Sequence, residues 1–269
     1  MCGRYVTITK IKEIEKRYRA ETTHPELYQP STNVSAGHHA PVITNENPRE
    51  IKFFQFGFTP SWAKKNMYVI NARSEGDLNP SDDPNYCGGK GIISKPMFRS
   101  SIRHKRCLII ADAFIEGPKQ EKLSRPYCVY MRKGERPFSM AGIWDRWLNP
   151  ESGEIVESFA IITAPANELM QKIGHHRSPV IVPQEKEQEW LCSTLELQEV
   201  TSFLSPYPAE NLNAYPIGPA IKNPRENGLH LLKPLGDRVF KEYDYQIYEE
   251  IQLFGMGDSP ARFRSVRNK

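Results

Sequence analysis

Cys2 is the first residue of the chain whose groups could carry out a reaction. Methionine is removed when the second residue is small, so loss of Met1 would leave Cys2 with a free α-amine beside its thiol. An α-amine has a pKa of about 7.7–8.0, so part of it is uncharged at neutral pH and can form a Schiff base with an aldehyde. The thiol can then add to the imine carbon and close a thiazolidine ring. An internal cysteine cannot do this because its nitrogen is an amide, although the residues alone also allow an incidental cysteine here.

A polar segment at residues 71–75 (NARSE) follows an aromatic-rich stretch. Asn71 can orient a reacting group through hydrogen bonds, and Arg73 can bind a phosphate through its planar guanidinium. Trp62, together with Phe56 and Phe58, could stack on nucleic-acid bases. The alternative is a sheet core that ends in a polar turn, and we expect some of these rings to be buried in either case.

Two acidic residues stand in the strongly apolar segment 107–116. Glu116 ends this segment, and a carboxyl at the end of a buried strand can have a raised pKa and act as a general acid and base. Asp112 is a weaker candidate for the same role. An exposed glutamate at a strand end is the alternative.

The segment 175–180 (HHRSPV) lies between a predicted helix and a strand. A histidine at such a junction can titrate near neutral pH, and Arg177 is a second residue of the type that binds phosphate. Neighbouring histidines on a strand point to opposite faces, so we expect only one of His175 and His176 to face a site. Capping or surface histidines are the alternative.

The pattern of apolar residues predicts several short elements. Helices are predicted at residues 8–19, 165–173, 184–191 and 195–204. Strands are predicted where short runs are rich in β-branched and aromatic residues, at residues 51–58, 67–70, 107–115, 127–132, 137–143 and 157–163. Residues 76–91 are predicted to form a flexible loop.

The order of these elements shows no regular alternation of strand and helix. The predicted fold class is therefore α+β, with a single domain built on a curved, mostly antiparallel, barrel-like β-sheet and peripheral helices. We expect this domain to span residues 2–235. Residues 236–269 would form a C-terminal extension that ends in a mobile basic tail.

Composition sets further limits on the function. The 269 residues carry a formal charge of +4, with basic residues gathered at 99–106 and 262–269, which suits a phosphate backbone but also fits a solvated surface. The five cysteines lack CxxC spacing, which argues against a disulfide framework and a zinc site. No apolar run reaches the roughly 18 residues of a membrane span, and the N-terminus lacks a secretory signal pattern, so we expect a cytoplasmic protein.

The order of these motifs resembles that of the SOS-response-associated peptidase family, whose members shield abasic sites by covalent crosslinking. The resemblance covers roughly residues 2–205. The matching segments are MCGRY at 1–5, GFTPSWA at 57–63, NARSE at 71–75, KPMFR at 95–99, RCLIIADAFIE at 106–116, TAPAN at 163–167 and HHRSPV at 175–180.

The resemblance implies a role for each candidate residue. Cys2 would be the crosslinking nucleophile and Asn71 would position it, while Glu116 would open the sugar ring as acid and base and His175 would transfer protons around the Schiff base. The implied DNA-binding residues are Arg4, Trp62, Arg73, Phe98, Arg99 and Arg177.

The partner that the resemblance implies is single-stranded DNA containing abasic sites, bound by a monomer without a metal or organic cofactor. It also implies removal of Met1 by autoproteolysis, which an aminopeptidase could equally perform, and some lyase activity. Three positions depart from the family pattern: Phe56 replaces a tryptophan, Ser178 a methionine and Gly117 the tryptophan after Glu116. The last change leaves open how deeply Glu116 is buried.

Two other functions fit part of the sequence. Glutamine amidotransferases with an N-terminal nucleophile also begin Met-Cys-Gly, but the sequence lacks the segments typical of their glutamine sites. A single-stranded nucleic-acid-binding protein without chemistry would need only the basic and aromatic residues.

Overall fold

The computed structural model describes residues 2–242, 247, 249 and 251. Five strands close on one another, because β10 pairs with β4, β4 with β3, β3 with β6, β6 with β9, and β9 again with β10. Only the β10–β4 pairing in this ring is parallel. The strands are β3 (His39–Thr44), β4 (Ile51–Phe56), β6 (Arg106–Ala111), β9 (Phe138–Leu148) and β10 (Ile155–Pro165). This closed ring confirms the predicted α+β fold with a barrel-like sheet.

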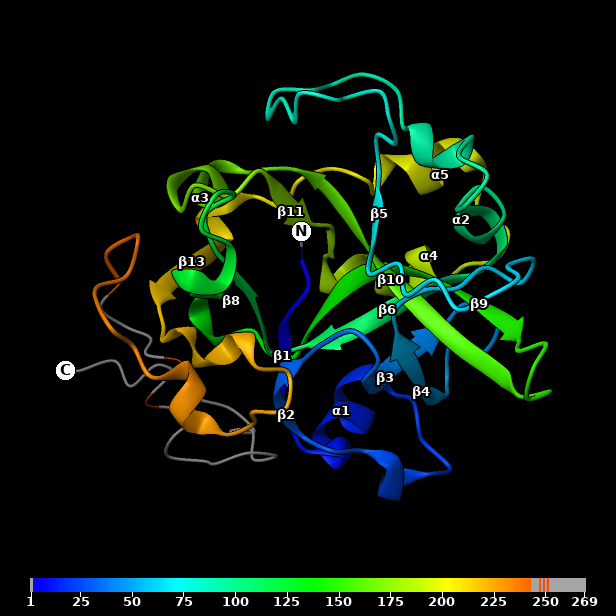
Figure 1. Ribbon diagram of the computed structural model, residues 1–269, viewed down its shortest axis with the longest axis horizontal. Coiled ribbons are helices and arrows are strands. Elements are labelled where there is room, and N and C mark those ends of the chain that lie inside the picture. Colours follow the sequence, from blue (N-terminus) through cyan, green and yellow to red (C-terminus); the bar gives the residue numbers. More distant parts are fainter. Residues whose placement is uncertain (1, 243–246, 248, 250, 252–269) are drawn as a thin grey trace.

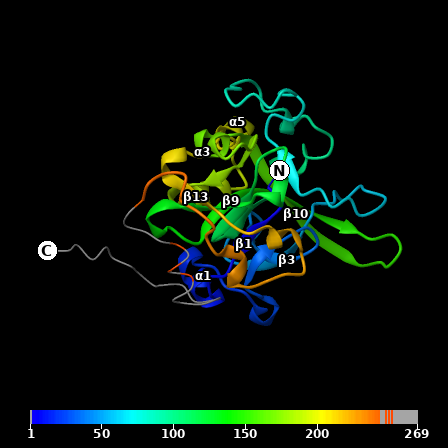
Figure 2. The same ribbon diagram turned by 60° about the vertical axis from the view of Figure 1, so that its left-hand side comes forward.

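Short strands extend the ring on one side. β5 (Asn71–Arg73) pairs in parallel with β10, β11 (Arg177–Pro179) pairs with β10, and β12 (Ile181–Val182) pairs with β9. Figure 2 shows the long β9–β10 hairpin projecting beyond the body of the molecule. The strands that carry Asn71, Arg73 and Arg177 therefore share β10 as their neighbour.

A second, antiparallel sheet packs against the ring. Its order is β13–β8–β7–β1–β2, with β1 (Tyr5–Thr7), β2 (Ser31–Val34), β7 (Ala113–Glu116), β8 (Tyr127–Met131) and β13 (Leu212–Pro216). Side chains alternate between its faces: Tyr5 and Phe114 enter the core shared with the ring, whereas Val6 and Ile115 enter a separate outer cluster. Glu116, two residues after Phe114, therefore faces the ring.

The helices are short and peripheral, as Figure 1 shows. The α-helices are α1 (Ile11–Tyr18), α2 (Ser101–His104), α3 (Glu168–Lys172), α4 (Glu187–Trp190) and α5 (Leu197–Ser202). The 3-10 helices are η1 (Pro25–Leu27), η2 (Gly91–Ile93), η3 (Lys122–Ser124), η4 (Arg132–Gly134), η5 (Gln184–Lys186), η6 (Ala209–Asn211), η7 (Pro219–Lys222) and η8 (Leu229–Leu232). None of the described helices is long and apolar enough to cross a membrane.

Several predicted elements are wrong in their bounds, and β1, β2, β3 and β13 lie where the sequence pattern predicted no strand. The strand predicted at 107–115 is broken in two at Asp112, whose carboxylate accepts hydrogen bonds from the backbone N–H groups of Ile8 and Thr9. The strand predicted at 67–70 begins only at residue 71, because Tyr68 adopts a left-handed φ of 50°. Pro165 ends β10 rather than starting α3, whose N-cap is Asn167.

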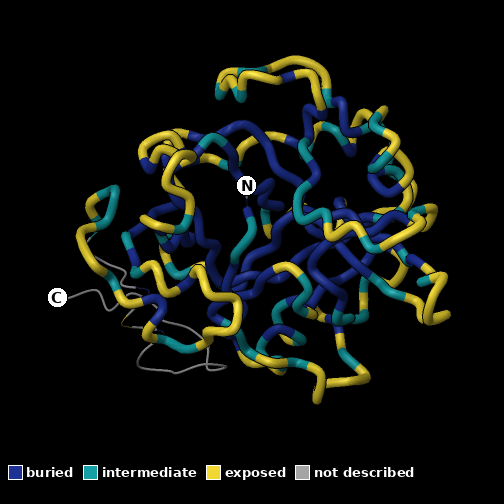
Figure 3. The backbone as a smooth tube through the Cα atoms, viewed as in Figure 1, coloured by how far each residue is buried: buried dark blue, intermediate teal, exposed yellow. Residues whose placement is uncertain are grey.

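The predicted C-terminal extension packs on the domain where it is described. Val239 donates a backbone hydrogen bond to Ala214, and Ile247 and Ile251 are buried in the outer cluster. The basic residues 262–269 lie outside the described residues. Figure 3 shows the buried backbone concentrated in the two sheets, whereas the loop at residues 76–90 is mainly exposed.

Candidate active site

The pairing of β1 with β7 brings Cys2 next to Glu116. Tyr5 lies opposite Phe114 in this pairing, so the residues before β1 run beside the end of β7. Asn71, the first residue of β5, reaches the same point, and its Nδ2 donates to the carbonyl oxygen of Cys2 at 2.9 Å. In the view of Figure 1, the blue segment that precedes β1 rises between β8 and β5. Three of the predicted catalytic residues thus meet between the two sheets.

The thiol of Cys2 is protonated at neutral pH in this setting. Cys2 is 1% exposed, and burial, followed by the charge of Glu116, raises the pKa of the thiol well above its ordinary value. Among the described residues, none donates a hydrogen bond to the buried Oδ1 of Asn71. An unused acceptor therefore lies beside Cys2.

Glu116 and His175 form a buried pair. Nδ1 of His175 lies 2.6 Å from the carbonyl oxygen of Gly117, and a carbonyl can only accept, so Nδ1 carries the proton. Burial lowers the pKa of His175 to about 3, so the ring is neutral and its Nε2 presents a lone pair to Oε2 of Glu116 at 3.3 Å. Burial also raises the pKa of Glu116 to about 7. A carboxyl that is protonated below this pH can therefore exchange its proton with His175.

Two glycines allow the chain to bring Glu116 and His175 together. A Cβ on Gly117 would lie 1.9 Å from the carbonyl oxygen of Lys122, so only glycine lets the chain close here. Glu116 is accordingly buried, at 3% exposed, without the tryptophan found at position 117 in the family pattern. Gly174, with φ of 77°, ends the turn after α3 and places His175 beside Gly117.

The two arginines predicted to bind phosphate both have carboxylate partners. Strand alternation directs Ala72 into the core, which leaves Arg73 on the face of β5 that carries Asn71. Arg73 donates to Asp82 at 2.6 Å. Arg177, on β11, is buried and forms two hydrogen bonds with Glu75, which is fully buried. Although burial opposes ionisation, the hydrogen bonds from Arg177 lower the pKa of Glu75.

The other predicted DNA-binding residues lie in different settings. Trp62 is 61% exposed and Arg99 is also exposed. Phe98 is only 6% exposed and packs against Phe58 in the core, which leaves little of its ring for a base. Arg4 is half-buried and donates to the carbonyl oxygens of Gly3 and Lys222.

Several groups at the site were not predicted from the sequence. They are the carbonyl oxygen of Gly117, Glu75, and the carboxylate of Asp82 with its contacts from Lys119 and His176. Glu75 could have been noticed, because it belongs to the NARSE motif. Asp82 and Lys119 carry no local signal, since only the fold brings them together.

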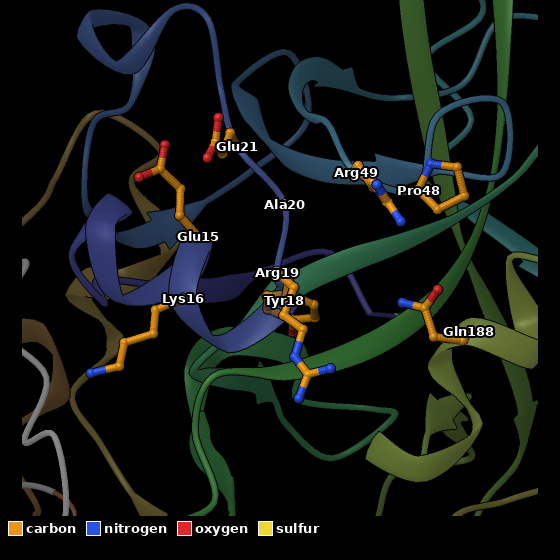
Figure 4. A pocket seen from close by; sticks show the side chains of 9 residues that line it. All are labelled: Glu15, Lys16, Tyr18, Arg19, Ala20, Glu21, Pro48, Arg49 and Gln188. Carbon is orange, nitrogen blue, oxygen red and sulfur yellow. The ribbon is translucent and has the colours of Figure 1, made fainter.

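A separate pocket of about 850 Å³ lies near α1 and holds none of the predicted site residues. Figure 4 shows its lining side chains, which come from α1, the segment directly after it, the β3–β4 connection and α4: Glu15, Lys16, Tyr18, Arg19, Ala20, Glu21, Pro48, Arg49 and Gln188. Within the described part of the chain, no three histidine, cysteine or acidic residues are grouped to hold a metal ion.

Comparison with known proteins relates this geometry to a family. The family model described as "SOS response associated peptidase (SRAP)" matches residues 1–224. Abasic site processing protein YoqW of Bacillus subtilis is 30% identical over 239 residues, which cover 87% of this chain and 99% of YoqW. Abasic site processing protein HMCES of Xenopus tropicalis is 26% identical, with 75% of this chain and 65% of that protein covered.

A solved structure agrees with these matches. A crystal structure of a protein from Bacteroides thetaiotaomicron superposes with a TM-score of 0.73 at 28% identity, covering 87% of this chain and 99% of that one. The family match spans most of the sequence, and the structural match spans most of the fold. The chain therefore belongs to the SOS response associated peptidase family.

Proposed function

We propose that this protein processes abasic sites in single-stranded DNA by capturing their aldehyde on Cys2 after Met1 has been removed. The observation that carries the proposal is the position of Cys2 beside a carboxyl with a pKa of about 7, which has a neutral histidine as its proton partner. The relatives YoqW and HMCES are named abasic site processing proteins, which supports abasic sites as the substrate.

Ring opening of the sugar is the first step. An abasic site is mainly a closed hemiacetal, and opening it breaks the bond between C1′ and the ring oxygen. This requires a proton on the ring oxygen and loss of the proton from the C1′ hydroxyl. Glu116 is suited to supply one proton and accept the other, with His175 as the group that holds a proton in between.

Capture of the aldehyde follows. The α-amine of Cys2 attacks the carbonyl carbon, and proton transfer through His175 releases water and forms the imine. The S–H bond of Cys2 then adds across the imine, so that sulfur bonds to carbon and the proton goes to nitrogen. A thiol that stays protonated until this step favours attack by the amine first. β-Elimination of an imine that has not closed would cleave the strand and give the lyase activity, whereas its hydrolysis would only return the aldehyde and the free amine.

Asn71 and the arginines would hold the substrate. Nδ2 of Asn71 is bonded to the Cys2 carbonyl, so its Oδ1 is placed to accept from the Cys2 amine or the opened sugar. Arg73 and Arg177 would bind the flanking phosphates, and the exposed ring of Trp62 offers a stacking surface for a base.

Intact mass spectrometry after incubation with an abasic oligonucleotide tests the proposal. The expected product is the chain without Met1, increased by the mass of the DNA less one water. Cys2→Ala should lose the heat-stable adduct but keep a Schiff base that borohydride can trap, whereas the exposed Cys192→Ala should behave as wild type. A heat-stable adduct in Cys2→Ala would overturn the thiazolidine step. Equal binding of intact and abasic strands with no covalent product would indicate a binding protein without chemistry.

A further inference from the structure

The carboxylate of Asp82 lies among four basic side chains. Its Oδ1 is 2.6 Å from Nη2 of Arg73 and 3.9 Å from Nη1 of Arg177, and its Oδ2 is 3.0 Å from Nζ of Lys119 and 3.9 Å from Nε2 of His176. These groups come from β5, β11, the segment after β7 and the turn before β11. One acidic side chain thus occupies the meeting point of the two arginines proposed to bind DNA phosphates.

The loop that carries Asp82 is otherwise exposed. Figure 1 shows residues 76–90 as an extended loop, in teal, that reaches across the top of the view. Asn79 fixes the start of this loop. Its side chain donates to the backbone carbonyl of Asp83 and accepts from the backbone N–H of Asp83, and its own backbone carbonyl accepts from Arg73. Asp82 itself adopts a left-handed φ of 58°, a conformation that aspartate tolerates better than most residues other than glycine. This turn directs its carboxylate to the basic cluster.

A carboxylate in this position resembles a bound phosphate group. Both anions present oxygen atoms to a guanidinium and an ammonium at hydrogen-bond distance. Nε of Arg73 and Nε of Arg177 are buried and donate to no acceptor in the described part of the chain, so neither guanidinium has all of its donors satisfied by the protein. Although partial burial disfavours its charge, the hydrogen bond from Lys119 and the charge of Arg73 lower the pKa of Asp82. Asp82 is therefore ionised at neutral pH.

The cluster carries more positive than negative charge, which favours binding of a further anion. Arg73, Lys119 and Arg177 carry three positive charges, against which stand the carboxylates of Glu75 and Asp82. Glu75 is fully buried behind Arg177 and stays in the site. Asp82 is on a surface loop and is the one anion of the cluster that can move away.

We infer that Arg73, Lys119, His176 and Arg177 form one phosphate subsite, and that Asp82 is an internal competitor that a DNA phosphate must displace. The inference rests on the proposed function and adds Lys119 and His176 to its DNA-binding residues. Displacement of Asp82 would move the 76–90 loop, so the acidic side chain sets how tightly the strand binds.

Binding of an undamaged single-stranded oligonucleotide, measured by fluorescence anisotropy, tests the inference without Cys2 chemistry. Asp82→Asn should bind about tenfold more tightly than wild type at about 50 mM salt, because it removes the competitor and its repulsion of the phosphate. Asp83→Asn is the matched control: it removes the same charge from the neighbouring, exposed residue of the loop and should change affinity less than about twofold. Lys119→Gln should weaken binding and reduce the salt slope by about one.

The outcomes separate this inference from the proposed function. Equal affinities of Asp82→Asn and Asp83→Asn, or weaker binding by Asp82→Asn, would overturn the competitor role while leaving normal adduct formation intact. An unchanged salt slope in Lys119→Gln would remove Lys119 from the subsite. Absence of any abasic adduct in wild type would contradict the proposed function instead.

Discussion

Oε2 of Glu116 and Nε2 of His175 lie 3.3 Å apart in the core of the molecule, where both side chains are buried. Because the carbonyl oxygen of Gly117 holds the proton of His175 on Nδ1, the second proton of the pair lies on the carboxyl. Below about pH 7 this carboxyl is protonated and faces the lone pair on Nε2 of the neutral ring, so a proton is held between the two groups. The relationship leads to predictions about stability as well as reactivity.

The free energy of unfolding should depend on pH through the ionisation of Glu116. Its folded pKa of about 7 lies above the unfolded value of about 4.3, so its contribution to folding is fully present below about pH 4 and is lost as the pH rises through 7. The side chain in Glu116→Gln cannot ionise. The free energy of unfolding of this variant, relative to that of wild type, should therefore be higher at about pH 8 than at about pH 4 by on the order of 3 kcal/mol. Urea unfolding at the two pH values measures this. A difference between the two proteins that does not change with pH would contradict the assignment.

The rate of adduct formation should depend on the same proton. The wild-type rate should rise as the α-amine of Cys2 loses its proton and fall as Glu116 ionises near pH 7. In Glu116→Gln the falling limb should disappear and the rate at neutral pH should drop about 100-fold. An aldehyde that cannot close into a ring needs no opening, so it should react with the variant at nearly the wild-type rate. Equal slowing with both substrates would argue against a role in ring opening.

The buried pair of Glu75 and Arg177 should be essential for stability. Glu75→Gln leaves the guanidinium of Arg177 buried without its charge partner, which we expect to lower the free energy of unfolding by about 3–5 kcal/mol. Glu121→Gln, in the exposed pair with Arg125, should change it by less than about 1 kcal/mol. Chemical denaturation of both variants makes the comparison, and similar values would show that burial of the first pair has little effect.

Gly117 should tolerate no side chain. In Gly117→Ala the added Cβ would lie 1.9 Å from the carbonyl oxygen of Lys122, so the backbone must move. We expect this shift to lower the free energy of unfolding by about 2 kcal/mol. It should also slow adduct formation, because His175 loses the carbonyl oxygen that accepts its proton. Gly89→Ala is a suitable control, since its Cβ would meet only Leu78, at 3.5 Å. Thermal unfolding and the single-turnover rate test both effects. Retention of both properties in Gly117→Ala would show that the segment adapts freely.

Local residue types predict the α+β fold class and the chemistry of the reactive groups, but not the strands β1, β2, β3 and β13. The continuous run of apolar residues before Glu116 predicts a buried strand, and strand alternation directs this carboxyl to the face of Phe114. The reactive groups of Cys2 and the hydrogen-bonding capacity of Asn71 follow from their chemical structure alone. The predicted element bounds were less accurate. Asp112 interrupts a strand through a tertiary hydrogen bond and Tyr68 through its left-handed φ, and a pattern of apolar residues shows neither.

Tertiary structure alone decided the electrostatic state of the site. Lys119 and Asp82 are 37 residues apart and Arg177 and Glu75 are 102 apart, so no local pattern could pair them. The sequence likewise assigns Arg73 to a phosphate without showing that a carboxylate already holds it. The proton on Glu116 also depends on burial between two sheets and on a carbonyl that orients His175. Ionisation depends on the distances and solvent around a group, and these exist only once the chain has folded.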